Sequence, residues 1–176
     1  MTPGGQPPAT APTSPAFVAT ACALMALVSL SIDAILPGLE SLAGDLGVAD
    51  GNRRQWVITA LFLGLACGQL IYGPMSDSIG RRKAILLGVA VFSAGSLVSA
   101  TAQSFEAMLV GRVIQGLGVA GSRTVTVAMI RDRFEGAAMA RLMSVIMTVF
   151  IMVPVLAPGL GQLVLLVAGW RVLFLF

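Results

Sequence analysis

The sequence predicts an all-α membrane protein with five transmembrane helices and the start of a sixth. Apolar residues make up 57% of the chain and charged residues 11%, and the mean hydropathy is +0.92. A soluble domain is about 25% charged. Five apolar runs are each long enough to cross a bilayer, which takes about 20 helical residues. Barrel strands would be about 9–11 residues long and would alternate in polarity, so these runs are helices.

The chain divides into a short tail and a transmembrane bundle. Residues 1–16 are rich in Pro, Thr, Ala and Gly and carry no charged side chain, so we expect a disordered cytoplasmic tail. Residues 17–176 form the bundle. Asp33 interrupts the first span, which ends at Pro37, and the sequence after Gly169 is typical of the first turn of a sixth helix. The expected spans are about 17–39, 56–72, 84–101, 105–130 and 139–166, with a truncated sixth from about 172.

Lysine and arginine set the expected orientation. Six of them follow the second and fourth spans and three lie on the opposite side, and basic residues are enriched in cytoplasmic loops. The loops after spans two and four, and the N-terminal tail, are therefore expected on the cytoplasmic side. The first group is Arg81, Arg82, Lys83, Arg131, Arg133 and Arg141, and the second is Arg53, Arg54 and Arg171.

Composition argues against several functions. The net charge of +3 is small and scattered, so no nucleic-acid partner is expected. The chain has no histidine, and Cys22 and Cys67 both lie in apolar runs, where we expect them to pack rather than to form a disulfide. We expect no metal, no cofactor and no enzymatic activity.

Small residues recur four apart in two of the spans. They are Ala60, Gly64 and Gly68 in the second span, and Gly116 and Ala120 in the fourth. Such stripes let helices approach closely, so we expect them to serve packing rather than to form a site.

The stretch GPMSDSIGRRK, Gly73 to Lys83, concentrates charge between spans two and three. It holds four of the nineteen charged residues, which are eleven basic and eight acidic. Its glycines allow a tight turn, and Asp77 is expected to cap or lie near a helix N-terminus. An ordinary cytoplasmic hairpin has the same features, so this stretch alone leaves both interpretations open.

The pattern G-x-x-x-D-x-x-G-R-R-K in this stretch resembles the signature loop of the major facilitator superfamily. Further segments are similar to motifs of its drug/proton antiporters. RVIQGLG from Arg112 resembles R-x-x-Q-G-x-G, and the segment from Pro154 to Gly161 resembles the G-P-x-x-G motif. The run SIDAILPGL, and the GWR before the sixth helix, are similar to the bicyclomycin/chloramphenicol-resistance (Bcr/CflA) branch. The sequence departs from these patterns, most of all in the fifth span, at Ser78, Arg123, Ala157 and Gln162.

The resemblance covers nearly the whole chain after residue 16 and implies a fold and a function. The family fold has two six-helix halves with the substrate path between them, and this chain resembles the N-terminal half. The implied function is a multidrug efflux transporter of the bacterial inner membrane, an antiporter that exchanges drugs or metabolites for protons. It would use the proton gradient and no cofactor, and its partners would be the lipid bilayer and a C-terminal half or second bundle. The alternatives are a truncated, non-transporting membrane fragment, and a half-sized carrier acting as a dimer, against which the odd number of spans argues.

Charged residues inside the spans are the candidate coupling site, because burying a charge in a membrane is costly. At about 1.5 Å per residue, Asp33 lies roughly 9 Å and Arg112 roughly 10 Å inside the outer ends of their helices. We therefore expect the two side chains to meet, directly or through water. Arg112, Gln115 and Arg123 fall near one face of the fourth span. The resemblance makes Asp33 the group that exchanges protons and Arg112 the group that tunes it, and the alternative is a structural ion pair.

Two further motifs are expected to govern conformation. Through the resemblance, charges at the inner ends of spans two to four form a network that latches the two halves together. The alternative is a set of exposed charges worth well under about 1 kcal/mol per pair. The loop motif comprises Gly73, Asp77, Gly80, Arg81, Arg82, Arg131 and Asp132, and the helix-kink antiporter motif comprises Pro154, Pro158 and Gly161.

Overall fold

The computed structural model describes residues 14–48 and 50–175. Within these ranges every regular element is helical, and five helical segments are long and apolar enough to cross a membrane, which confirms the predicted fold class. The predicted tail lies mostly outside the described residues, and its last two residues begin the first helix. The elements are α1 (Pro15–Asp33), η1 (Leu36–Gly38), α2 (Leu39–Asp45), α3 (Gly51–Arg54), α4 (Trp56–Ile79), α5 (Arg81–Ala100), α6 (Phe105–Arg133), α7 (Gly136–Ala168) and η2 (Trp170–Phe174).

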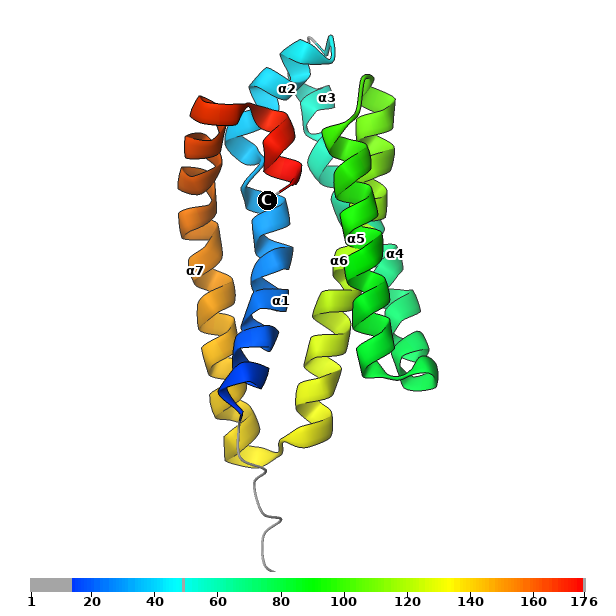
Figure 1. The fold of residues 1–176 in the computed structure, drawn as a ribbon, viewed down its shortest axis with the longest axis vertical. Helices are drawn as coiled ribbons and strands as arrows, with labels where there is room; N and C mark the ends of the chain where they lie inside the picture. Colours follow the sequence, from blue (N-terminus) through cyan, green and yellow to red (C-terminus); the bar gives the residue numbers. More distant parts are fainter. Residues whose placement is uncertain (1–13, 49, 176) are drawn as a thin grey trace, which may run out of the picture.

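The long helices form two groups that lie side by side (Figure 1). Helices α1 and α7 run alongside each other, and α4, α5 and α6 form the second group. Helix α6 packs against both α4 and α5 and also contacts α1, so it joins the two groups. The short η2 folds back from the end of α7 and contacts α5. Polar side chains on α6 are therefore placed at the boundary between the groups.

Glycines allow α6 its close contact with α4 and α5. A methyl group added at Gly64 would overlap the backbone carbonyl of Val113, and one added at Gly116 would overlap the facing backbone of α4. Gly118 lies equally close to the backbone of α5 at Phe92. The small-residue stripes therefore have the packing role that the sequence predicts.

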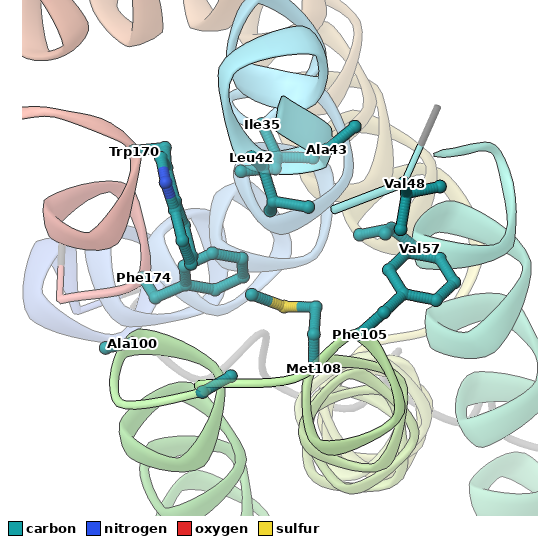
Figure 2. Packing of buried hydrophobic residues seen from close by; sticks show 11 residues of the cluster. Ile35, Leu42, Ala43, Val48, Val57, Ala100, Phe105, Met108, Trp170 and Phe174 are labelled. Atoms are coloured by element: carbon teal, nitrogen blue, oxygen red, sulfur yellow. The ribbon is translucent and has the colours of Figure 1, made fainter. Parts of the chain in front are cut away.

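An apolar cluster closes the end of the bundle where α1 passes into α2 (Figure 2). Trp170 and Phe174 of η2 pack there with Leu42, Phe105 and Met108. The two aromatic rings meet edge to face with their centroids 6.2 Å apart, a favourable arrangement for an aromatic pair. This cluster fixes η2 over the interior of the bundle.

The outward surfaces of α4, α5 and α7 carry many exposed apolar side chains. A surface of this kind suits lipid or another protein rather than water. Among its most exposed members are Leu70, Ile71, Leu86, Leu97, Val155, Leu163, Leu166 and Val167.

Some helix boundaries differ from the sequence prediction. The apolar run of the second span ends at Tyr72, but α4 continues to Ile79, because helical hydrogen bonding needs no apolar side chain. Most of the predicted loop is therefore helix, and Gly80, with a φ of +90°, makes the turn into α5. The start of the predicted sixth helix is a short 3₁₀ helix, and the chain after Asp33 continues as η1 and α2 to Asp45.

Candidate functional site

Arg112 lies at the boundary between the two helix groups and is 1% exposed. Its Nε donates a hydrogen bond to the backbone carbonyl of Val57 in α4 at 3.2 Å. Its Nη1 donates to the carbonyl of Ser31 in α1 at 3.1 Å and to Oε1 of Gln115 at 2.8 Å. Across the described residues, its Nη2 has no hydrogen-bond partner.

Gln115 is held in place by a second hydrogen bond. Its Nε2 donates to Oγ of Ser96 in α5 at 2.9 Å. Ser96, Gln115 and Arg112 therefore form a buried polar chain that begins on α5, runs along α6 and ends on backbone carbonyls of α4 and α1. The guanidinium carbon of Arg112 also lies 5.5 Å from the centroid of the Phe174 ring, within cation–π range.

Arg112 is a buried charge without a carboxylate partner in the part of the chain that the structure describes. A buried charge is costly unless it is paired and its hydrogen-bonding groups are satisfied. Three hydrogen bonds and the Phe174 ring compensate part of this cost, but the free Nη2 leaves two N–H donors available. The site is therefore chemically suited to an additional acceptor, such as a carboxylate or a water molecule.

A small cavity borders this arginine. Its volume is about 30 Å³, which is enough for one or two water molecules. Arg112, Gln115 and Ser31 give its wall a polar side, and apolar side chains of α1, α7 and η2 complete it. Asp33 is absent from this lining.

Asp33 and Arg112, predicted to meet directly or through water, make no direct contact among the described side chains, and a contact through water stays a prediction. Asp33 instead accepts a hydrogen bond from Oγ of Ser29 at 3.4 Å, and no ion pair involves it among the described side chains. The predicted depth agrees with the structure, because Arg112 binds the carbonyl of Ser31, two residues before Asp33. A shared depth alone does not bring the two side chains together. The Asp33 carboxylate accepts from Ser29, one turn back on its own helix, and does not reach Arg112.

Arg123 lies away from the Arg112 site. It is exposed, and its guanidinium carbon lies 6.0 Å from the centroid of the Phe150 ring in α7. It borders a cavity of about 440 Å³ at the end of the bundle where α4 turns into α5. Asp77, Arg81, Arg131 and Asp132 line the same cavity. The predicted coupling residues are therefore split: Arg112 and Gln115 lie together, and Arg123 belongs to the polar cavity.

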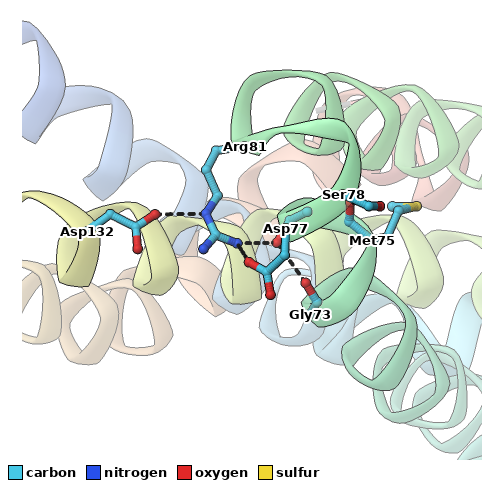
Figure 3. Close-up of polar contacts among 7 residues, drawn as sticks. Gly73, Met75, Asp77, Ser78, Arg81 and Asp132 are labelled. Carbon is cyan, nitrogen blue, oxygen red and sulfur yellow. Dashed lines mark hydrogen bonds and ion pairs between the residues drawn. The ribbon is translucent and has the colours of Figure 1, made fainter.

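Arg81 is the centre of the charge network predicted at this end (Figure 3). Its Nε lies 2.9 Å from Oδ2 of Asp132 in α6, and its Nη1 contacts Asp77 and the hydroxyl of Ser76. These contacts tie the α4–α5 turn to the end of α6. Arg131 lines the nearby cavity but makes no ion pair among the described residues.

Asp77 lies in the last turn of α4, one turn before the start of α5, and does not cap a helix. Of the predicted turn glycines, Gly80 has positive φ, and Gly73 is an ordinary helical residue. Arg82 is exposed at the start of α5.

The predicted kink motif lies where α7 packs against α1. Helix α7 continues through Pro154 and Pro158. A proline has no N–H, so Pro154 leaves the carbonyl of Phe150 without its helical donor. The hydroxyl of Ser29 in α1 donates to that carbonyl at 3.4 Å. A methyl group at Gly161 would overlap the carbonyl of Ala34, the residue directly after α1, so this glycine allows α7 to touch the end of α1.

Sequence reasoning missed several residues of the site. Ser29 and Ser96 are small polar residues within apolar spans, and Ser29 precedes Asp33 by one helical turn, which was an available signal. Asp45 accepts a hydrogen bond from Nε1 of Trp170 at 2.8 Å and pairs with Arg171 at 3.4 Å. This clamp between α2 and η2 joins segments more than a hundred residues apart, so no local pattern indicates it.

The fold and the site define a class of protein: a multi-pass helical membrane protein with a buried, polar interior, an arrangement typical of transporters. A sequence model of the family described as Major Facilitator Superfamily matches residues 21–176. The chain belongs to the major facilitator superfamily, as its motifs predict.

The relatives of this chain include transporters and multidrug resistance proteins. "Uncharacterized MFS-type transporter YdgK" of Bacillus subtilis (strain 168) is 34% identical over 153 residues, which cover 86% of this chain and 38% of that protein. "Multidrug resistance protein MdtL" of Klebsiella pneumoniae (strain 342) is 33% identical over 158 residues, covering 90% and 40%. The protein of the same name from Salmonella typhi is 32% identical over the same length and coverage. The chain spans about two fifths of the length of these relatives.

Proposed function

We propose that the chain provides one helical bundle of a proton-coupled multidrug efflux transporter of the bicyclomycin/chloramphenicol-resistance branch. Relatives named multidrug resistance protein support the drug-export part of this proposal. The observation that carries the coupling part is Arg112. In the described part of the chain this buried guanidinium has no carboxylate partner and keeps the two N–H groups of Nη2 without an acceptor.

Asp33 is the proposed proton carrier that works with Arg112. It lies on α1 at the depth of Arg112, and α1 already contacts the guanidinium through the carbonyl of Ser31. In the proposed cycle, ionised Asp33 moves toward Nη2 of Arg112 and accepts a hydrogen bond from it. Protonation neutralises the carboxylate and weakens that attraction, because a charge-assisted hydrogen bond is about twice as strong as a neutral one. The proton gradient supplies the energy, and the cycle uses no other cofactor.

The drug site is assigned to the space between this bundle and a second one. A pocket for a drug-sized ligand measures about 300–1,000 Å³, whereas the cavity beside Arg112 is about 30 Å³. That cavity suits water molecules that connect Arg112 with a proton path. We propose that a second bundle supplies the other wall, and that the two bundles rock about this site in alternating access.

The Arg81 network is the proposed conformational latch. It holds the α4–α5 turn against α6 through two acidic partners. We place this end of the bundle in the cytoplasm and the carrier in the bacterial inner membrane, because the loops there are the richer in arginine and lysine. The substrates are proposed to be small-molecule drugs or metabolites.

The test is proton-driven efflux from membrane vesicles by a carrier that contains both bundles. We expect Asp33→Asn to express normally and to lose efflux driven by a proton gradient, because an amide cannot release a proton. Glu40→Gln, an exposed change on α2, is the matched control and should keep efflux. Undiminished efflux by Asp33→Asn would remove Asp33 from the mechanism and leave it a structural residue.

A further inference from the structure

The hydroxyl of Ser29 lies between two acceptors on different helices. Its Oγ is 3.4 Å from Oδ2 of Asp33 on α1 and 3.4 Å from the backbone carbonyl of Phe150 on α7. Ser29 is 2% exposed. A serine hydroxyl has one hydrogen to donate. It can therefore satisfy one of these two acceptors at a time. Both distances exceed the roughly 2.5–3.0 Å of a full O–H···O hydrogen bond, so neither acceptor is fully bonded in this arrangement.

The Phe150 carbonyl depends on this donor because of Pro154. In an α-helix the carbonyl of residue 150 would accept from the N–H of residue 154, and a proline has none. Ser29 is the side-chain donor that the structure gives this carbonyl among the described residues. A hydroxyl on α1 thus replaces a hydrogen bond missing from the backbone of α7.

The charge of Asp33 decides which acceptor Ser29 serves. An ionised carboxylate is the stronger acceptor, since charge-assisted hydrogen bonds are about twice as strong as neutral ones. The Ser29 hydrogen then turns to Asp33, and the Phe150 carbonyl loses its donor. When a proton binds Asp33, the carboxyl O–H can itself donate to Oγ of Ser29, which frees the Ser29 hydrogen for Phe150. On release, this proton leaves to water, and no other covalent bond changes.

We propose that Ser29 is a positioning residue that transmits the protonation state of Asp33 to α7 at Pro154. The inference rests on the proposed function, in which Asp33 exchanges protons. It adds that proton binding locks α7 to α1 at the Phe150 carbonyl and that proton release frees it. The coupling motif of the first span and the kink motif of the fifth are then parts of one device.

Other charged and titratable groups surround this device. Two are arginines of α6. Helix α7 has no charged residue between positions 142 and 168. Arg112 donates a hydrogen bond to the Ser31 carbonyl of α1, Arg123 lies over the Phe150 ring, and Tyr72 of α4 belongs to the apolar cluster that contains Val28 and against which Phe150 packs. Glu40 and Asp45 on α2, and Arg171 on η2, lie beyond the end of α1. Glu40→Gln therefore serves as the control for a carboxylate outside the device.

The experiment is a double-mutant cycle on the full chain in lipid nanodiscs. Ser29→Ala removes the side-chain donor to the Phe150 carbonyl, and Pro154→Ala gives that carbonyl a backbone N–H donor. Ser29→Ala should therefore destabilise the protein less when Pro154 is already Ala. The equilibrium constant for unfolding is measured for both single variants and the double variant, above and below the titration of Asp33. The carboxyl band of Asp33 in the infrared difference spectrum, identified by its loss in Asp33→Asn, defines that titration. Matched controls are Pro158→Ala, which acts on another carbonyl, and Thr20→Val, whose hydroxyl bonds within α1.

The expected result is a coupling of about fivefold in the unfolding equilibrium with Asp33 protonated, and close to none with it ionised. Asp33→Asn should keep the coupling at every pH, because its amide can donate to Ser29 as the protonated carboxyl does. Two results would overturn the Ser29 relay alone while the Asp33 band still titrates. One is a Ser29–Pro154 coupling energy that does not change with pH, and the other is an equal coupling energy between Ser29→Ala and Pro158→Ala. An Asp33 band that never titrates would overturn the proposed function together with the relay.

Discussion

Substitution of Arg112 separates the cost of its charge from the value of its hydrogen bonds. Arg112→Lys keeps a buried charge but cannot reach the oxygens of Val57, Ser31 and Gln115 together, because a lysine ammonium is compact and lacks the guanidinium fork. Losing two of three hydrogen bonds to a charged group, at about 1.5–3 kcal/mol each, predicts a destabilisation of about 3–6 kcal/mol.

Arg112→Met removes the charge and has a smaller expected effect on stability. It leaves Oε1 of Gln115 unsatisfied, which costs about 1–3 kcal/mol. The carbonyl of Val57 lies within α4 and keeps its helical partner, whereas the carbonyl of Ser31 is among the last four of α1 and has no backbone donor in the described part of the chain, so the loss of its Arg112 donor adds a similar cost. Removal of a buried, unpaired charge offsets this loss by several kcal/mol. Arg112→Met should therefore be more stable than Arg112→Lys by about 2 kcal/mol or more.

The assay is reversible unfolding of the purified variants in mixed micelles, with tryptophan fluorescence as the readout, followed by efflux measurements. We expect both variants to lose proton-driven efflux, because neither presents a guanidinium to the cavity. Gln115→Leu combined with Arg112→Met removes the unsatisfied amide as well and should recover part of the stability that the single Met variant loses, since the Ser31 carbonyl still lacks its donor. A Met variant less stable than the Lys variant would refute the view that Arg112 is a buried charge with incomplete compensation.

Three further predictions concern packing, the clamp and the charge network, and unfolding measurements check each of them. Gly64→Leu should destabilise the protein by about 1–3 kcal/mol or more, because the new side chain meets the backbone of α6. Gly73→Leu, at a position with open space, should change stability far less, and equal effects would contradict the close approach. Trp170→Phe should cost about 1.5 kcal/mol through the lost hydrogen bond to Asp45, and the loss should vanish when Asp45 is already Ala. Asp132→Asn should cost under about 1 kcal/mol, because its ion pair is half exposed, and a larger loss would show that the network holds the fold together.

The sequence was sufficient to predict the helices and their packing surfaces. Long apolar runs predict membrane helices because backbone polar groups must be satisfied within lipid. Gly64 and Gly116 lie at the predicted close contacts because a side chain at either position would occupy the backbone of the neighbouring helix. The end of α4 was wrong by seven residues, since hydropathy reports where the hydrocarbon ends and not where the helix ends.

The sequence predicted the depth of the site residues in the membrane but not the direction in which their side chains point. Spacing along the sequence gave Asp33 and Arg112 a common depth, and the contact between Arg112 and the Ser31 carbonyl agrees with it. The direction in which each side chain points depends on how α1 turns against α6 and α7, and this is set by contacts between distant residues. Gly161 against α1 is one such contact, and its partner cannot be identified from either segment alone.

Helix α1 is the element on which the two sides of the proposed mechanism meet. On one side its backbone at Ser31 accepts a hydrogen bond from Arg112, which belongs to the group of α4, α5 and α6. On the other side, the Ser29 hydroxyl contacts the carbonyl of Phe150 in α7, which lacks its helical donor because of Pro154. Asp33 is one turn from Ser29 and two residues from Ser31, so a change in its charge acts on both contacts over a short distance. A proton bound to one carboxylate can in this way change how α1 is held by both helix groups, which is the kind of rearrangement that alternating access requires.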